Sequence, residues 1–177
     1  GDVTAVDGQA DAPPACDPNE VPADGGVFVS KRSEGGTGTA VSPYSSIGKA
    51  LDHLGSGKTV YIDAAIYGES LTIEGDVTLR GGWKLGSDGK WLRQCSPNVA
   101  GQVEIKSPSN IGIRIKAGTV KLQDLTVSTR DGQQVEGSDG ESTYGIWASG
   151  NGTLLHLVNA IVAAGKGGDG AAASGVG

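Results

Sequence analysis

The sequence predicts an all-β protein, a solenoid of stacked parallel strands with one capping α-helix near the N-terminus. Three observations lead to this prediction. Glycine makes up 31 of 177 residues, well above the usual ~7%, and this abundance without a collagen period indicates many turns between short strands. A single helical pattern precedes the strands, and the later strands repeat one another.

The helical pattern covers residues 45–55. Its apolar residues fall at i, i+3, i+4 and i+7, on one face of a helix: Ile47, Ala50, Leu51 and Leu54. Ser45 or Ser46 can cap the start, and Gly55 is expected to end the helix. A solenoid exposes apolar core and strand edges at each end, so we expect this helix to cover the first coil.

The stretch GSGKT at residues 55–59 matches part of the phosphate-binding loop pattern Gly-x-x-x-x-Gly-Lys-Ser/Thr. The first glycine of that pattern would stand at position 52, which is Asp52. The motif also runs from strand to helix, whereas here the helix comes before a β-branched strand that starts near Thr59. The stretch is therefore predicted to be a helix-to-strand connector and not a nucleotide site.

The strands after Thr59 contain an internal repeat. A set of four positions recurs with an offset of 35 residues (155 − 120 = 35), pairing Val120, Leu122, Asp124 and Val127 with Leu155, Leu157, Asn159 and Val162. An earlier partial copy sets Leu71, Ile73, Val77 and Leu79 against Ile113, Ile115, Val120 and Leu122. We expect these copies to stack as parallel strands, with Asp124 and Asn159 at a shared bend. The alternative is an antiparallel sandwich with a chance match.

Residues 1–25 are small, polar and acidic, and predict an extended tether. Residues 26–177 are predicted to form one β-helical domain. Within it, residues 26–58 hold a first strand and the cap helix, and residues 59–177 hold the coils.

The two cysteines, Cys16 and Cys95, both lie in loop-like surroundings. Free cysteine is usually buried, so we predict a disulfide that joins the end of the tether to the body; the alternative is two unpaired surface thiols. With only His53 and His156 in addition, no metal site built from cysteine and histidine is predicted.

The N-terminal half resembles a known family. The segments GVFVS (26–30), SPYSSIGKALDHL (42–54), GKTVYIDAAIYGESLTI (57–73) and DVTLRGGW (76–83) follow one another in this order. Together they resemble the N-terminal segment of bacterial secreted right-handed parallel β-helix proteins, the pectate-lyase-like superfamily. The resemblance is close over residues 26–83 and extends to the later coils only by pattern. It departs at Ala65-Ile66, where the family pattern has a glycine.

This resemblance implies a right-handed parallel β-helix and a secreted or cell-surface location in a bacterium. It also implies that any active site would lie on the flank, framed by loops that leave the coils. The architecture is shared by lyases, hydrolases, adhesins and inert scaffolds, so the resemblance does not assign a chemistry.

The segment RDGQQVEGSDGES (130–142) contains four carboxylates: Asp131, Glu136, Asp139 and Glu141. Clustered carboxylates on a flank loop can bind Ca²⁺ or act as acid and base on a sugar. The alternative is a solvated surface loop. Arg130 and Arg114 are candidates for a basic partner, but no motif marks either, and no catalytic residue is predicted.

The aromatic residues predict no sugar-binding platform. Tyr144 and Trp147 are three residues apart in a strand, which places them on opposite faces. Trp83 and Trp91 flank the loop KLGSDGK and are expected in the core or over it.

The net charge of −6 argues against a nucleic-acid surface, and no stretch approaches the ~18 apolar residues of a membrane span. We therefore expect a secreted or cell-surface β-helix scaffold or adhesive binding module without catalysis of its own. The alternative is a carbohydrate-active enzyme, a polysaccharide lyase or glycoside hydrolase that uses the acidic loop. The third hypothesis is a Ca²⁺-stabilised binding domain; otherwise no cofactor is expected.

The C-terminal stretch AAGKGGDGAAASGVG (163–177) shows no amphipathic helix that could cap the last coil. We therefore expect residues 1–177 to be the N-terminal part of a longer solenoid, or another copy to cover the open C-terminal end. Polysaccharide is the other expected partner.

Overall fold

The computed structural model describes residues 16–55, 58–134 and 139–170, which form three β-sheets, one α-helix and one short 3-10 helix. The first sheet contains β1 (Val27–Val29), β2 (Lys58–Asp63), β5 (Val77–Leu85), β9 (Thr119–Gln123) and β12 (Leu154–Val158), with β6 (Trp91–Arg93) beside β5. The second contains β3 (Ala65–Tyr67), β7 (Val103–Ser107), β10 (Thr126–Thr129) and β13 (Ile161–Ala163). The third contains β4 (Leu71–Glu74), β8 (Ile111–Ala117) and β11 (Tyr144–Ala148).

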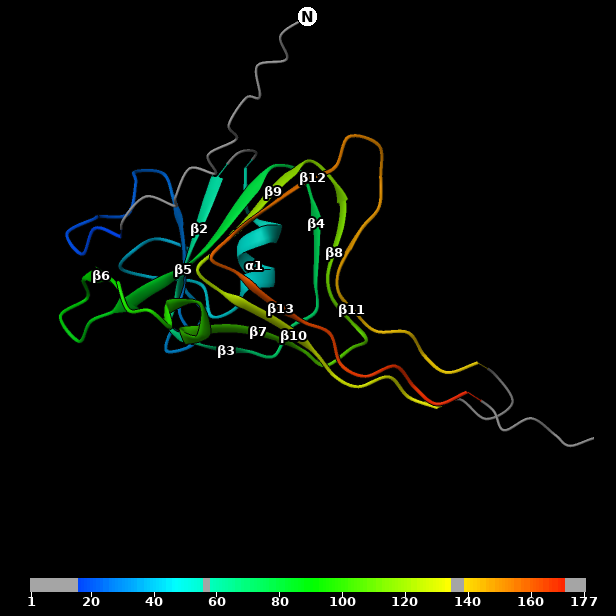
Figure 1. Ribbon diagram of the computed structural model, residues 1–177. Coiled ribbons are helices and arrows are strands. Elements are labelled where there is room, and N and C mark those ends of the chain that lie inside the picture. Colours follow the sequence, from blue (N-terminus) through cyan, green and yellow to red (C-terminus); the bar gives the residue numbers. More distant parts are fainter. Residues whose placement is uncertain (1–15, 56–57, 135–138, 171–177) are drawn as a thin grey trace, which may run out of the picture.

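The chain visits the three sheets in a fixed order, and each visit to all three is called a round. The first round is β2, β3 and β4, the second β5, β7 and β8, and the third β9, β10 and β11, after which β12 and β13 begin a fourth. Each strand pairs in parallel with its counterpart in the next round; the described exception is the antiparallel hairpin of β5 and β6. The sheets face one another around a common interior (Figure 1). An all-β fold with parallel sheets is confirmed, and the antiparallel sandwich is wrong.

The repeat found in the sequence is the register of the strands. Leu155 and Leu157 of β12 pair with Val120 and Leu122 of β9, and Val162 of β13 pairs with Val127 of β10. The partial copy pairs as well, since Leu71 and Ile73 of β4 lie opposite Ile113 and Ile115 of β8, and Val77 and Leu79 of β5 opposite Val120 and Leu122. The apolar members of each set face inward and stack along the interior, which explains the recurrence.

The bend shared by the repeats is built from Asp124 and Asn159. Both adopt a left-handed backbone, with φ of 55° and 47°, a conformation that Asp and Asn tolerate better than other residues with a side chain. The Asn159 amide donates a 2.8 Å hydrogen bond from Nδ2 to Oδ1 of Asp124. This contact links the third round to the fourth.

Helix α1 (Ile47–Asp52) covers one end of the interior. The Ser46 side chain caps its first turn by accepting from the Lys49 amide, while His53, and not Gly55 as expected, occupies the C-cap. Ile47 and Ala50 are fully buried, and Leu51 and Leu54 pack against the same core. Glu69 holds the helix start with both carboxylate oxygens, which accept from the amides of Ile47 and Gly48. Because β2 follows α1, the helix-to-strand order predicted around GSGKT is confirmed.

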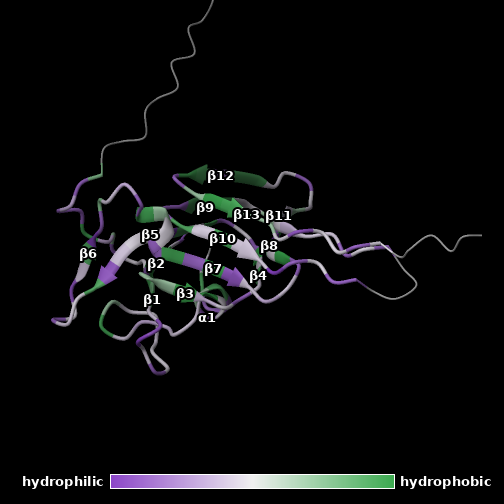
Figure 2. Ribbon diagram, turned by 60° about the horizontal axis from the view of Figure 1, so that its bottom comes forward, coloured by the Kyte–Doolittle hydropathy of each residue, from purple (hydrophilic) through white to green (hydrophobic). Residues whose placement is uncertain are grey.

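The other end of the interior is formed by β11, β12 and β13 (Figure 2). Among the described residues, no helix lies over it. Apolar side chains of β12 and β13 are therefore exposed at this end, in contrast to the covered side chains beside α1.

The described part of the tether, residues 16–25, contains no helix or strand and is fastened to the first sheet. The predicted disulfide between Cys16 and Cys95 is present. The Ala23 amide also donates a 2.9 Å hydrogen bond to the Tyr61 hydroxyl. We call residues 16–25 the strap. A small aromatic cluster lies on the first sheet, made of Phe28, Tyr61, Trp83 and Trp91, and residues 18–25 line a pocket together with Phe28 and Trp91 of this cluster. Trp83 and Trp91 thus lie in a core, as expected. No helix in the described ranges is long and apolar enough to cross a membrane.

Candidate functional site

The acidic loop predicted from sequence forms a lateral extension of three backbone segments. Residues 130–134 run outward, residues 139–143 return, and residues 164–170 lie alongside both (Figure 1). Backbone hydrogen bonds join the three, from the Gly132 amide to the Lys166 carbonyl at 2.6 Å, and from the Gly168 amide to the Glu141 carbonyl at 2.8 Å. Glu136 lies outside the described residues, and Asp139 begins the returning segment.

Glycine permits the close approach of these segments. A Cβ on Gly140 would lie 1.8 Å from the Gly168 carbonyl oxygen, and one on Gly132 would lie 2.4 Å from the Glu141 carbonyl oxygen. Any side chain there would force the backbones apart. The glycine content of this region is thus a packing requirement of the extension.

Two carboxylates of the loop, Asp131 and Glu141, hold the loop's own structure together. Glu141 accepts from Arg130 through both oxygens, at 2.7 and 3.0 Å, and from the Gln133 amide at 2.9 Å. Asp131 accepts from the Lys166 amide at 2.8 Å. The carboxylate oxygens that accept these hydrogen bonds are already engaged within the loop. Within the described ranges, no group of three or more metal-ligating side chains is present. The Ca²⁺ and acid–base hypotheses for this loop stay predictions.

The ion pair in the loop makes the charge state of Glu141 depend on Arg130. The hydrogen bonds from Arg130 and from the Gln133 amide hold the pKa of Glu141 below its ordinary value. When the pKa of a carboxyl group is lower in the folded state than in the unfolded state, its ionised form stabilises the folded loop at pH values above the unfolded-state pKa. This stabilisation is lost as the pH falls through the lower, folded-state pKa. We expect Arg130→Gln to raise the pKa of Glu141 in an NMR titration of its side-chain carbon. Lys166→Gln is the control and should leave the pKa of Glu141 unchanged. If the pKa of Glu141 in the Arg130→Gln variant equals that in the parent protein, the ion pair does not lower it.

An ion network that the sequence did not reveal connects the strap to three rounds, and it is buried at Arg93 and Asp124. Glu20 of the strap pairs with Arg80 at 2.6 Å and lies 3.3 Å from Nε of Arg93. Arg93 pairs in turn with Asp124 at 2.5 Å, and both side chains are almost fully buried. Asp124 then binds Asn159. A cavity of about 710 Å³ beside the network is lined by the disulfide, both arginines and Asn159.

The exposed end at β12 and β13 differs sharply from the interior that it continues. Leu122 and Val127 are 0% exposed, whereas their counterparts one round later, Leu157 and Val162, are 48% and 40% exposed. We call the inward-facing side chains of Leu155, Leu157 and Val162 the open end. In the described part of the chain, no strand pairs with the outer edges of β11, β12 and β13, so this surface is a template for a further parallel strand in each sheet.

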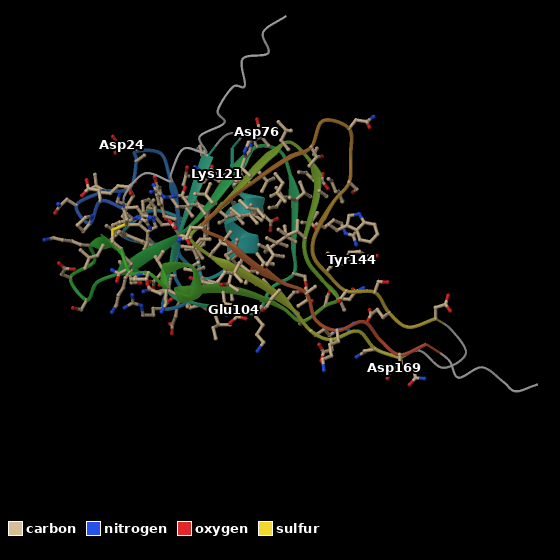
Figure 3. The ribbon with its side chains drawn as sticks, viewed as in Figure 1. Asp24, Asp76, Glu104, Lys121, Tyr144 and Asp169 are labelled. Carbon is tan, nitrogen blue, oxygen red and sulfur yellow. A yellow bond between two sulfur atoms is a disulfide. The ribbon has the colours of Figure 1, made fainter. Side chains whose placement is uncertain are left out.

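Contrary to the prediction, Tyr144 and Trp147 lie together. Their ring centroids are 4.6 Å apart with an interplanar angle of 67°, and Tyr144 lies on the outer side of β11 (Figure 3). The alternation of inward and outward side chains along β11 is interrupted between them, because two consecutive residues, Gly145 and Ile146, both face inward. A Cβ on Gly145 would lie 2.3 Å from Cγ1 of Val162 in the interior, and Ile146 packs against the core.

Comparisons with protein family models, with curated proteins and with solved structures give no match. The open end and the acidic loop are therefore the features of the molecule that bear on its function.

Proposed function

We propose that the chain is a right-handed parallel β-helix of a secreted or surface-displayed bacterial protein, and that it serves as a scaffold or adhesive binding module without catalysis of its own. The fixed order of visits to three parallel sheets supports the β-helix. The right hand follows from the general preference of parallel crossover connections. The disulfide favours an oxidising compartment outside the cytoplasm.

The observation that carries the proposal is the asymmetry of the two ends. Helix α1 buries the first end, while the open end leaves Leu157 and Val162 about half exposed. A protein that works by extension needs one closed end, which stops growth, and one end that accepts a further layer. Asn159 lies in the last described round and is exposed. Its side-chain amide, which donates to Asp124 of the preceding round, can therefore form the same kind of hydrogen bond with a further round.

The acidic loop supports the scaffold more than the enzyme. Its carboxylates at Asp131 and Glu141 are bound by the loop's own backbone and by Arg130. A lyase or hydrolase needs acid and base groups that are free to meet a substrate. The engagement of these two carboxylates therefore favours a structural role for the loop.

Self-association of the 177-residue chain tests the proposal, with a second copy as the occupant of the open end. We expect light scattering to show a mass that rises with concentration. The double variant Leu157→Lys/Val162→Lys should stay monomeric, because two charges at the junction would be buried without partners. Leu92→Lys is the matched control, since Leu92 is 49% exposed but lies in β6, away from the open end.

Two outcomes would count against this proposal. A wild-type chain that is strictly monomeric at high concentration shows that the open end takes no second copy. A double variant that associates as strongly as the Leu92→Lys control shows that association uses another surface.

A further inference from the structure

Two arginines are held in fixed positions beside the strap. The antiparallel hairpin carries Arg80 on β5 and Arg93 on β6, and Arg93 pairs in register with Trp83. Trp83 is fully buried, and both guanidiniums lie over its ring, with their central carbons 5.6 Å (Arg80) and 5.5 Å (Arg93) from the ring centre. Stacking on an aromatic ring fixes the plane of a guanidinium. The hairpin therefore presents two oriented positive charges.

Glu20 of the strap bridges these arginines but does not satisfy both. Its carboxylate oxygens accept from Nη1 and Nη2 of Arg80, at 2.6 and 2.7 Å. One of these oxygens also lies 3.3 Å from Nε of Arg93, which is an ion-pair distance. Among the described residues, however, Nε of Arg80 and Nε of Arg93 are buried and have no hydrogen-bond acceptor. The two oxygens of one carboxylate thus leave two buried donors without a hydrogen bond.

The free donor of Arg93 faces the position of the Glu20 carboxylate. The Arg93 side chain is 4% exposed. Its other nitrogens are engaged, because Nη1 donates to the carbonyls of Gly81 and Gly82 and Nη2 donates to Asp124. A buried donor without an acceptor costs free energy. An anion with an additional oxygen directed at Nε of Arg93 would therefore bind here better than a carboxylate does.

A phosphate group has the required oxygens. Its oxygens do not lie in one plane, so two can accept from Arg80 while a third accepts from Nε of Arg93, and its charge near pH 7 is about −1.5 to −2. The adjoining cavity of about 710 Å³, lined by both arginines and the disulfide, has a size typical of small-molecule sites, ~300–1,000 Å³. We propose that Arg80 and Arg93 form a binding site for a phosphate group, free or carried by a small molecule, and that Glu20 is its intramolecular competitor.

The strap determines how strongly Glu20 competes. It is fastened at Cys16 by the disulfide and continues into β1 at Val27, so Glu20 acts at a high effective concentration. The ion pair that must open is partly exposed, with side chains 17% (Arg80) and 32% (Glu20) exposed, and such pairs are weak. We therefore expect the competition to weaken phosphate binding only on the order of tenfold.

Two further carboxylates line the cavity. Asp124 is paired with Arg93 and accepts from Asn159 as well. Asp17 is exposed, so solvent and salt screen its charge, with a screening length of about 8 Å at physiological ionic strength. Displacement of Glu20 then leaves the positive charge of Arg80 for the ligand. The site is independent of the open end, so the proposal goes beyond the scaffold role.

The test is a titration of the oxidised 177-residue chain with inorganic phosphate at constant ionic strength. The Nε–H signals of the arginines, followed by NMR, report directly on the two donors that lack an acceptor. We expect the signals of Arg80 and Arg93 to shift and saturate. The signal of Arg114, for which no ion pair is recorded among the described residues, should not move at the same concentrations. Acetate should bind on the order of tenfold more weakly, because it reproduces only the contacts of Glu20.

Variants separate the site from general electrostatics. Glu20→Gln removes the competitor and should tighten phosphate binding on the order of tenfold. Glu74→Gln is the matched control, because it also removes one carboxylate that pairs with a cation, Lys116, but from an exposed ion pair; it should leave binding unchanged. Adding Arg80→Gln to Glu20→Gln should abolish the gain.

Methyl phosphate distinguishes the two sources of the group. If it binds at least as tightly as inorganic phosphate, the ligand is a small molecule that carries the group; weaker binding assigns the site to the free ion.

Four results would overturn the site. They are no shift at Arg80 and Arg93 in the Glu20→Gln variant, an equal gain from Glu20→Gln and Glu74→Gln, acetate binding as tight as phosphate binding, and a shift of Arg114 over the same concentration range. Equal binding of acetate would indicate a site for acidic peptides instead. The oligomeric state of the same samples reports on the open end separately.

Discussion

Arg93→Met is expected to lower the free energy of unfolding by about 4 kcal/mol, the usual range for removing one partner of a buried ion pair being roughly 3–5 kcal/mol. The Arg93 and Asp124 side chains are 4% and 6% exposed, so the substitution leaves the Asp124 carboxylate buried without its cation. Glu20 loses one of its two arginines as well. Arg93 also donates to the carbonyls of Gly81 and Gly82, at 3.2 and 2.8 Å.

Denaturant unfolding measures this effect, with Lys116→Met as the matched control. The pair of Lys116 and Glu74 has a similar length, but its side chains are 52% and 61% exposed. Exposed pairs contribute roughly 0–1 kcal/mol, so the control should change stability little. If both variants lose the same amount, the burial of the Arg93 network is not what stabilises the protein.

Removing the disulfide is expected to cost roughly 4 kcal/mol by chain entropy, because it closes a long loop in the unfolded chain. Cys16 and Cys95 are 79 residues apart. In the folded protein the strap keeps its contacts from Glu20 to Arg80 and from Ala23 to Tyr61. The loss should therefore appear in the free energy of unfolding of Cys16→Ser/Cys95→Ser, while the β-sheet signal in circular dichroism is retained.

Thiol alkylation before reduction gives an independent check of the disulfide. The intact mass should show no alkylated cysteine under non-reducing conditions and two after reduction. Two reactive thiols in the untreated protein would contradict the bridge, and a double variant as stable as the parent would contradict its expected contribution.

The fold was largely predictable because its determinants are local or periodic. The stripe of Ile47, Ala50, Leu51 and Leu54 specifies an amphipathic helix, and the 35-residue offset is the register between rounds. The helix end was less predictable: Gly55 suggested a later stop, but the last turn closes at Asp52, where His53 takes the C-cap.

The contacts of the ion network could not be predicted, because they depend on register across separate segments. Arg80 lies 60 residues from Glu20, and Arg93 lies 31 residues from Asp124. The repeat singled out Asp124 and Asn159, but nothing marked Arg93 as their partner, since β6 returns by a hairpin outside the repeat.

The outer aromatic pair was mispredicted for a specific reason. Alternation assigns Tyr144 and Trp147 to opposite faces, and glycine gives no side chain from which to detect an exception. The same feature occurs one round earlier, where a Cβ on Gly112 would meet Cγ1 of Val127 at 2.8 Å while Ile113 is also buried. A Gly-Ile pair at corresponding positions of two repeated strands was the available signal.

Amide hydrogen exchange of β12 and β13, compared between dilute and concentrated protein, tests the central claim most directly. Among the described residues, no further strand pairs with the outer edges of β12 and β13. Amides on these edges should therefore exchange fast when the protein is dilute and slowly when a second layer pairs with them. Amides of β2, which lies between β1 and β5, should be protected at both concentrations and serve as the internal reference. The predicted result is that amides of β12 and β13 exchange more slowly in the concentrated protein, while amides of β2 exchange at the same rate at both concentrations. Unchanged rates in β12 and β13 at both concentrations would contradict it.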